Sequence, residues 1–151
     1  MTEELFWELI GRLDWRNRDD HRAIARPLID ALARLPVEEI RAFDELLAEK
    51  LYALDTVEHA RHIGRPSYKG REKVFSADRF LYTRCLAVAK GRAFYERALA
   101  DPRRMPKNQD FEDLLAAGWK AFEARTGKAY DRLTRVSFET FSNTEGWAGA
   151  D

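Results

Sequence analysis

The amino-acid sequence predicts an all-α fold, a compact single-domain bundle of five or six helices that ends in an irregular C-terminal tail. Apolar residues recur at the i, i+3, i+4 spacing of amphipathic helices in several stretches before residue 127. Helix-capping residues precede these stretches, and glycine or proline follows most of them. A polar and apolar alternation at 137–143 is too short to indicate a sheet. With 151 residues and no repeat or linker, the chain is expected to form one domain over residues 1–151.

The first part of the chain is expected to form three helices. Thr2 is the N-cap candidate of the first, which is expected from residue 3 to about 13. The second follows Asp20, and Pro27 either kinks it or opens its main part. The third follows Pro36 and has the strongest apolar stripe in the chain, formed by Ile40, Phe43, Leu47, Leu51 and Leu54.

The position of several polar residues depends on where this third helix ends. If the helix continues to Gly64, then Glu58, Arg61 and His62 share the face of its apolar stripe. The segment 64–73 that follows is a loop by composition, and it is the most basic stretch of the chain. A face that changes from apolar to polar would then border a basic loop.

The second part of the chain is expected to form two or three helices and the tail. Ser76 caps a helix that Gly91 interrupts, so one bent helix and two separate helices both fit the pattern. Asp101-Pro102 ends this region. Asp110 is expected to cap the last helix, and Gly127 is its C-terminal stop. The remaining residues are expected to form an ordered but irregular tail.

Composition excludes several classes of protein. The 26 basic and 26 acidic side chains cancel, which disfavours nucleic acid and anionic membrane surfaces as partners. Cys85 is the single cysteine, so neither a disulfide framework nor a multi-cysteine zinc site can form. The N-terminus is acidic where a secretory signal is basic, and no apolar run reaches membrane-spanning length. We therefore expect a cytoplasmic protein without a cofactor, and the sequence predicts no particular oligomeric state.

Several separated motifs, in the same order, resemble a bacterial family known as domain of unknown function 4240. The central motifs are Ser76-Ala77-Asp78-Arg79-Phe80, Arg84, Gly91-Arg92, Tyr95-Glu96, Ala98-Leu99 and Asp101-Pro102. The flanking ones are Phe6-Trp7-x-Leu9-Ile10, Phe111-Glu112-x-Leu114-Leu115 before Thr126-Gly127, and Ser142-Asn143. The resemblance implies a compact helical, cytoplasmic protein and no known activity or cofactor.

The chain also departs from the pattern of this family. Ala77 stands where the family has the first of two acids, and Thr83 stands where it often has an aromatic residue. The segment 57–63 replaces a small apolar stretch that ends in glycines. A site that depends on the paired acids is therefore not expected here.

Arg84 is the residue at which structure and function are hardest to separate, because it lies on the apolar stripe of its helix. A guanidinium that faces a core needs a carboxylate, a set of carbonyls or an anionic ligand. One interpretation is an internal salt bridge to Glu58, Asp55 or Asp78. The other is a carboxylate- or phosphate-binding pocket whose second wall is the basic loop 64–73.

Glu58 and His62 have the i, i+4 spacing at which two side chains on one helix face can reach the same ion. Only these two ligands converge locally, because His59 is expected to point away, so no metal site is predicted. No nucleophile is apparent beside them, and no catalytic residue is predicted. Cys85 is expected to be an inert core residue.

Two hypotheses for function follow. The favoured one is a protein-binding module of the regulatory or accessory kind, with candidate contact residues Trp15, Tyr68, Lys69 and Arg71. The alternative is an enzyme or small-ligand-binding protein with a polar, anion-binding pocket formed by Glu58, His62, Arg84 and Arg92. The alternative predicts that these four side chains converge on a cavity that solvent can reach.

Overall fold

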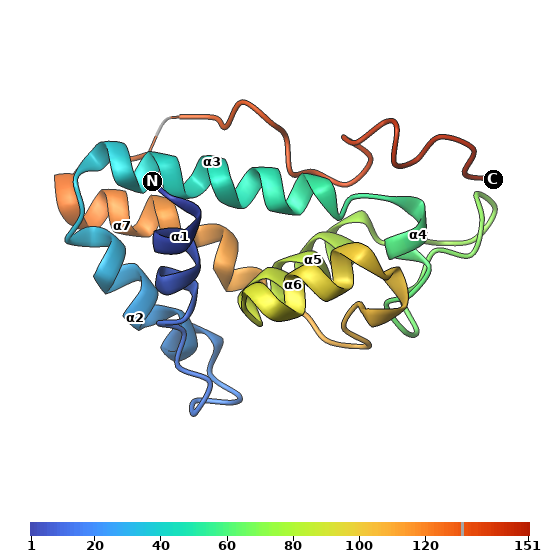
Figure 1. The fold of residues 1–151 in the computed structure, drawn as a ribbon, viewed down its shortest axis with the longest axis horizontal. Helices are drawn as coiled ribbons and strands as arrows, with labels where there is room; N and C mark the ends of the chain where they lie inside the picture. The colour runs from blue at the N-terminus through green and yellow to red at the C-terminus, as the bar shows by residue number, and fades with distance from the viewer. Residues whose placement is uncertain (131) are drawn as a thin grey trace.

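The protein is described by a computed structural model that covers residues 1–130 and 132–151. Within these residues, every regular element is helical, which confirms the all-α, single-domain prediction (Figure 1). The α-helices are α1 (Glu3–Ile10), α2 (His21–Ala33), α3 (Val37–Ala53), α4 (Val57–Ala60), α5 (Ala77–Ala89), α6 (Arg92–Ala100) and α7 (Ala117–Thr126). Two 3-10 helices complete the set, η1 (Pro102–Arg104) and η2 (Glu112–Ala116). None of the described helices is long and apolar enough to cross a bilayer.

The first two helices start at the expected capping residues. The Thr2 side chain accepts a hydrogen bond from the Leu5 backbone N–H, and the Asp20 side chain accepts one from Ala23. Helix α1 ends at Ile10, before the predicted residue 13. Helix α2 continues through Pro27, which lies in its interior and does not open it.

The third helix does not continue to Gly64. Helix α3 ends at Ala53, and the short helix α4 begins at Val57 after Thr56, whose hydroxyl caps it by accepting from the His59 N–H. The expectation that Glu58, Arg61 and His62 extend the apolar face of α3 is therefore wrong. Helix α4 is also the reason that the described residues form seven α-helices where five or six were predicted.

Gly91 separates α5 from α6, so the two-helix alternative is correct. Its φ of +99° lies in a region that side-chain-bearing residues rarely adopt, which ends α5 and lets the chain start a new helix. Ser76 caps α5 as predicted, and Gly127 ends α7 in the left-handed conformation. Asp110 caps no helix: it forms an ion pair with Arg79 at 3.3 Å, and η2 precedes α7.

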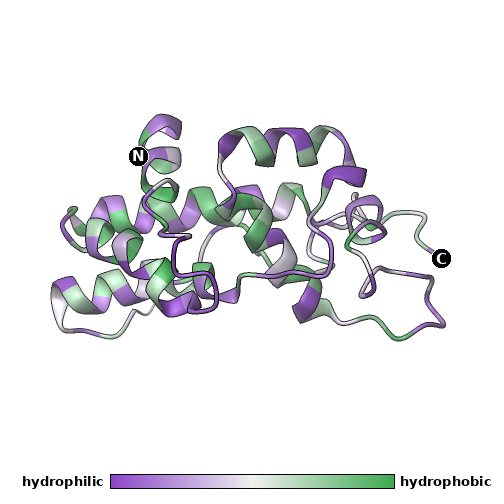
Figure 2. Ribbon diagram, turned by 90° about the horizontal axis from the view of Figure 1, so that it is seen from below, coloured by the Kyte–Doolittle hydropathy of each residue, from purple (hydrophilic) through white to green (hydrophobic). Residues whose placement is uncertain are grey.

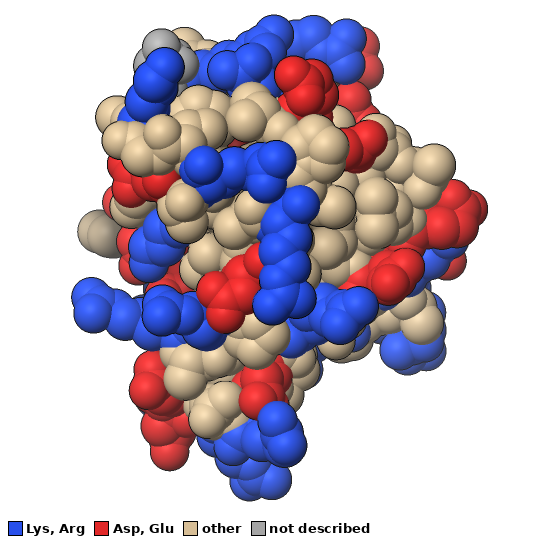
Figure 3. Space-filling model, turned by 90° about the vertical axis from the view of Figure 1, so that its left-hand side faces the viewer, with Lys and Arg blue, Asp and Glu red and all other residues tan. Residues whose placement is uncertain are grey.

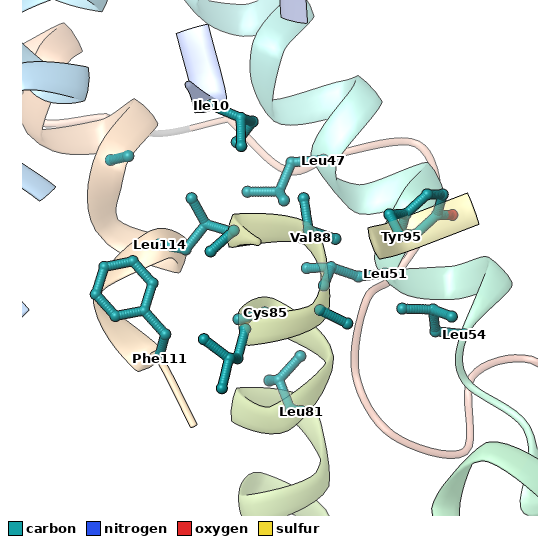
Figure 4. Close-up of a cluster of buried hydrophobic side chains, with 14 of the residues drawn as sticks. Ile10, Leu47, Leu51, Leu54, Leu81, Cys85, Val88, Tyr95, Phe111 and Leu114 are labelled. Atoms are coloured by element: carbon teal, nitrogen blue, oxygen red, sulfur yellow. The ribbon is translucent and has the colours of Figure 1, made fainter. Parts of the chain in front are cut away.

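Helix α5 runs through the centre of the molecule, and its stretch Thr83–Ala89 is buried on all sides. Side chains from α1, α3, α6 and η2 surround it in one hydrophobic core (Figure 4). Apolar segments of the ribbon accordingly face inward and polar ones outward (Figure 2). Cys85 is fully buried in this core, and burial raises the pKa of its thiol to about 12, which agrees with an inert core cysteine.

The C-terminal tail has no regular secondary structure within its described residues, as predicted. It leaves the end of α7, runs along α3 and ends close to α4 and the loop 64–73 (Figure 1). Residues far apart in the sequence are therefore brought together beneath it.

Candidate functional site

The four residues proposed to form an anion pocket do not converge. Glu58 is exposed on α4 and pairs with Arg61, and Arg92 is exposed at the start of α6 and pairs with Glu96 at 2.9 Å. His62 is partly exposed after the end of α4, whereas Arg84 is completely buried in α5. The structure therefore contains no polar pocket built from Glu58, His62, Arg84 and Arg92.

Arg84 is held by backbone carbonyls and a hydroxyl. Its Nη1 donates to the carbonyls of Leu51 at 2.8 Å and Phe138 at 3.0 Å, and its Nη2 donates to the Thr140 hydroxyl at 2.9 Å. Its guanidinium also lies 4.7 Å from the ring centroid of Phe80. Burial lowers the pKa of this guanidinium, and the negative charge of nearby Asp55 opposes that shift.

The salt bridge expected between Arg84 and Glu58, Asp55 or Asp78 does not form among the described residues. The carbonyl of Leu51, near the end of α3, is available because the last four C=O groups of a helix lack intrahelical partners. The other acceptors come from the tail. Arg84 therefore fastens the tail to α3 and α5, and it does not line a cavity.

Asp55 is a second buried anchor for the tail, and sequence reasoning had considered it only as a partner for Arg84. Its carboxylate accepts the backbone N–H groups of Phe141 at 3.2 Å and Asn143 at 3.0 Å. It also accepts the indole N–H of Trp147 at 2.8 Å. All three of these donors to the Asp55 carboxylate belong to the tail. Because its indole N–H binds this buried carboxylate, Trp147 packs inward.

His59 is a buried structural histidine. Its Nε2 lies 2.9 Å from the Ala98 carbonyl of α6, and its Nδ1 lies 2.7 Å from the Thr56 hydroxyl. The Nε2–H therefore donates to the carbonyl while Nδ1 accepts from the hydroxyl. Burial lowers the pKa of His59, so the neutral ring is favoured. Within the described residues, no three metal-ligating side chains are close enough to hold an ion.

An apolar pocket lies between α3, η2, α7 and the tail residues 130 and 132–139. Its volume is about 350 Å³, which is within the range of small-molecule sites. Leu47, Leu115 and Trp119 form one side, and Leu133 and Phe138 of the tail lie opposite. This pocket was not predicted, because most of its lining residues come from a segment without a periodic pattern.

Asp44 places a carboxylate in the wall of this pocket. Gly118 of α7 makes room for it, because a Cβ at that position would collide with both carboxylate oxygens. Burial raises the pKa of Asp44 to about 6, the Tyr130 hydroxyl opposes the shift by hydrogen bonding, and the charge of Glu45 adds to it. Burial, followed by the charge of Asp44, also raises the pKa of Tyr130. The one sequence signal was an acid directly beside the apolar stripe of α3.

The loop 64–73 divides into an inward and an outward part. Tyr68 is buried, and its hydroxyl donates to the backbone oxygen of Asp151 at 2.7 Å, so it is an internal anchor and not the exposed contact residue that was predicted. Lys69 and Arg71 are exposed and line a shallow hollow together with Arg61 and Lys73.

An aromatic cluster adjoins this hollow. The rings of Tyr68, Phe75, Phe141 and Trp147 pack edge-on or tilted against one another, with centroid separations between 4.6 and 6.2 Å. Phe141 remains half exposed at the edge of the cluster, and Val74 is fully exposed. Basic and apolar side chains thus share one end of the molecule.

Trp15 lies at the opposite side of the core. Its ring packs 5.3 Å from that of Phe111, which agrees with a residue that covers a helix end, and 41% of it remains exposed. Arg18, His21 and Lys90 border the same surface hollow. Trp15 therefore keeps an exposed edge beside basic side chains.

Comparison with known proteins gives one match. Residues 1–124 match a family described as "Protein of unknown function (DUF4240)". No curated protein and no solved structure matches the chain. The matched range includes α1 to α6 and nearly all of α7, and it ends before the tail that covers Arg84 and Asp55.

Proposed function

The chain belongs to the DUF4240 family, whose function is unknown. From its surfaces we propose that the protein is a cytoplasmic, bacterial protein-binding module of the regulatory or accessory kind. The proposed contact surface comprises Lys69, Arg71, Lys73, Val74 and Phe141, and we call it the basic apolar surface. Its partner is an acidic protein segment that carries an apolar side chain. The lone, buried Cys85 supports a reducing compartment.

The conformation of Phe141 is the observation that carries this proposal. Its φ is +77°, a conformation that costs a residue with a side chain roughly 1–2 kcal/mol. The backbone N–H of Phe141 donates to the buried Asp55 carboxylate, which holds the residue in place. The side chain nevertheless stays 49% exposed. The fold therefore holds Phe141 in a strained backbone conformation without burying its whole apolar side chain. Strained residues of this kind cluster at functional sites such as ligand clamps and switch regions, which supports a role in binding.

Charge and exposure around Phe141 favour an acidic, apolar partner. Val74 is fully exposed between Lys73 and the packed ring of Phe75. The bases Lys69, Arg71 and Lys73 outnumber the acids Glu72 and Asp151 in the adjoining hollow. Apolar anchors surrounded by a charged rim are the usual anatomy of a protein interface.

The same features favour protein over nucleic acid. The whole chain is neutral, with 26 basic and 26 acidic side chains, and both signs are interspersed over the face shown in Figure 3. On the basic apolar surface, Trp147 meets Phe141 with its ring plane at 64°, and its indole N–H is bound to Asp55. An aliphatic residue and edge-packed rings suit a side-chain anchor better than stacked bases.

Selection of short peptides from a random library on the immobilised protein tests this proposal. Selected binders should be acidic with an apolar residue, and their addition should shift the NMR signals of residues 69–75 and 141. Val74→Ser and Phe141→Gly should each weaken binding by about tenfold while the fold is kept, because one side chain is exposed and glycine accepts the positive φ.

Leu133→Ser is the matched control, since Leu133 is also exposed but lies away from this surface. It should leave peptide binding unchanged. Equal losses for Leu133→Ser and Val74→Ser would contradict the assigned surface. Tighter binding of single-stranded oligonucleotides than of any selected peptide, with strong salt dependence, would replace the protein partner by nucleic acid.

A further inference from the structure

The pocket between α3, α7 and the tail contains a carboxylate without a cationic partner. Glu45 and Glu49, on the same helix as Asp44, both lie within 4 Å of Arg135. Among the described residues, no Lys or Arg side chain pairs with Asp44 in this way, although Arg132 also lines the pocket, and the charge of the acid Glu45 adds to the rise in the pKa of Asp44. The Tyr130 hydroxyl lies near this carboxylate and opposes the rise in its pKa by hydrogen bonding. The carboxylate therefore has capacity for a further, positively charged donor.

We propose that this pocket binds a small organic amine, with the ammonium group on Asp44 and Tyr130 and the apolar body against Leu47, Leu115 and Trp119. This site is separate from the basic apolar surface and does not depend on the function proposed above.

Several properties of the pocket select an amine. A cation compensates the carboxylate, whereas an anionic ligand would add a second negative charge to a partly buried site. The indole of Trp119 offers a face of the kind that attracts ammonium groups, as the nearby Lys120 Nζ at 5.7 Å from its centroid illustrates. Leu133 and Phe138 extend the apolar part of the wall, which fits an apolar body, and the opposite charges of Arg132 and Glu139 border the same pocket.

The dimensions of the pocket favour a free small molecule. A volume of about 350 Å³ is at the lower end of the usual range for ligand sites. The tail segment forms one wall opposite the helices, so the carboxylate lies in the side of a partly open pocket. Phe138 belongs to that wall, and its carbonyl is bound by Arg84, which keeps this part of the tail in position.

Amine binding should depend on pH in a defined way. The charged and titratable groups near Asp44 are Arg41 and Glu45 on α3 and Tyr130, Arg132 and Glu139 in the tail, while the lining residues of η2 and α7 are uncharged. Since an ammonium needs the ionised Asp44, affinity should fall as Asp44 becomes protonated. With its pKa at about 6, affinity at pH 5 should be about tenfold lower than at pH 7.5.

Titration of the intact protein with 2-phenylethylamine tests the proposal, with calorimetry for affinity and methyl NMR signals of Leu47 and Leu115 for location. We expect saturable binding at pH 7.5 that shifts both signals. Asp44→Asn keeps the side-chain shape and should weaken binding at least about tenfold, and the remaining binding should no longer depend on pH. Glu49→Gln is the matched control on the same helix and should leave affinity unchanged.

The neutral analogue 2-phenylethanol separates a charge-selective site from a general apolar one. Equal affinities for the alcohol and the amine would overturn the proposal, and so would an Asp44→Asn variant that binds the amine like the wild type. A panel of aryl and alkyl primary amines that leaves the Leu47 and Leu115 signals unmoved would also refute it. None of these outcomes bears on peptide binding at the basic apolar surface.

Discussion

Arg84 shows how a buried cation can be accommodated without a carboxylate partner. Its guanidinium joins the end of α3, the helix α5 that carries it and the tail, through two carbonyls and the Thr140 hydroxyl. That hydroxyl in turn donates to the Ala77 carbonyl at the start of α5. Each of these three oxygen atoms is an acceptor that would be buried without a donor if Arg84 were absent. The hydrogen bonds of the guanidinium therefore connect three separate segments of the chain.

Replacing Arg84 by methionine should therefore destabilise the fold. The methionine fills part of the volume but leaves the Leu51 and Phe138 carbonyls without their donor, for an expected loss on the order of 3 kcal/mol. The free energy of unfolding in urea measures it. Arg92→Met is the matched control: its pair with Glu96 is exposed to solvent, and the expected loss is much smaller than that of Arg84→Met. Similar losses for the two variants would contradict the role assigned to Arg84.

The raised pKa of Asp44 predicts how the free energy of unfolding depends on pH. Its pKa is raised to about 6 in the folded protein from 3.8 in the unfolded chain, so the folded state binds more protons between these values. The contribution of Asp44 to the free energy of unfolding is therefore fully present below pH 3.8 and is lost as the pH rises through 6. After allowance for the partial exposure of Asp44, this contribution is on the order of 1–3 kcal/mol.

Thermal unfolding of wild type and Asp44→Asn over this pH range measures the effect. The variant should be the more stable protein at neutral pH, and the difference between the two melting temperatures should shrink as the pH falls towards 4. A difference that grows on acidification would reverse the assigned sign. The same variant then tests both amine binding and the electrostatic origin of the pocket.

At the scale of elements, local sequence signals predict most helix starts but not the break between α3 and α4. Thr2, Asp20 and Ser76 each cap a helix with their own side chains, and such caps are visible within a few residues. The break coincides with Asp55, whose donors come from residues 86 to 92 positions later. The residues that follow on the same face, Glu58, Arg61 and His62, are polar, so the pattern alone left open whether the helix continues to Gly64.

The sharp junction between α5 and α6 rests on the backbone freedom of Gly91. Its φ of +99° with ψ of 171° is a region that is essentially restricted to glycine, and an added Cβ would meet no atom within 4 Å. Gly91→Ala should therefore destabilise the protein by about 1–3 kcal/mol through backbone strain alone. Urea unfolding measures this loss.

Gly127→Ala provides the comparison, because its φ of +70° lies in the left-handed helical region and its Cβ also meets open space. Its expected cost is about 1 kcal/mol, less than that of Gly91→Ala. The opposite order of the two losses would show that the α5 to α6 junction adapts to a side chain.

At the scale of the whole molecule, the tail determines how much of the site could be predicted. Composition and helical spacing were enough for the all-α class, and Arg84 was recognised as a residue that needs compensation. Two of the three acceptors of Arg84, the donors of Asp55 and most of the residues that line the Asp44 pocket belong to the described part of the tail. No periodic pattern places that segment, so its contacts could not be derived from the sequence.

Deletion of residues 137–151 should consequently weaken the helical domain, although the family match ends at residue 124. The deletion removes Phe138, Thr140, Phe141, Asn143 and Trp147, which together supply the tail's hydrogen bonds to Arg84 and Asp55.

At about 1 kcal/mol for each of these hydrogen bonds, the truncated chain should stay helical by circular dichroism but melt roughly 10–20 °C lower. Adding a synthetic peptide of residues 128–151 should restore part of this loss, because the peptide carries the missing donors and acceptors. A truncated chain that melts at the temperature of the intact protein would mean that hydration replaces these contacts at no cost. Arg84 and Asp55 would then be fastening points for the tail that contribute nothing to the stability of the bundle.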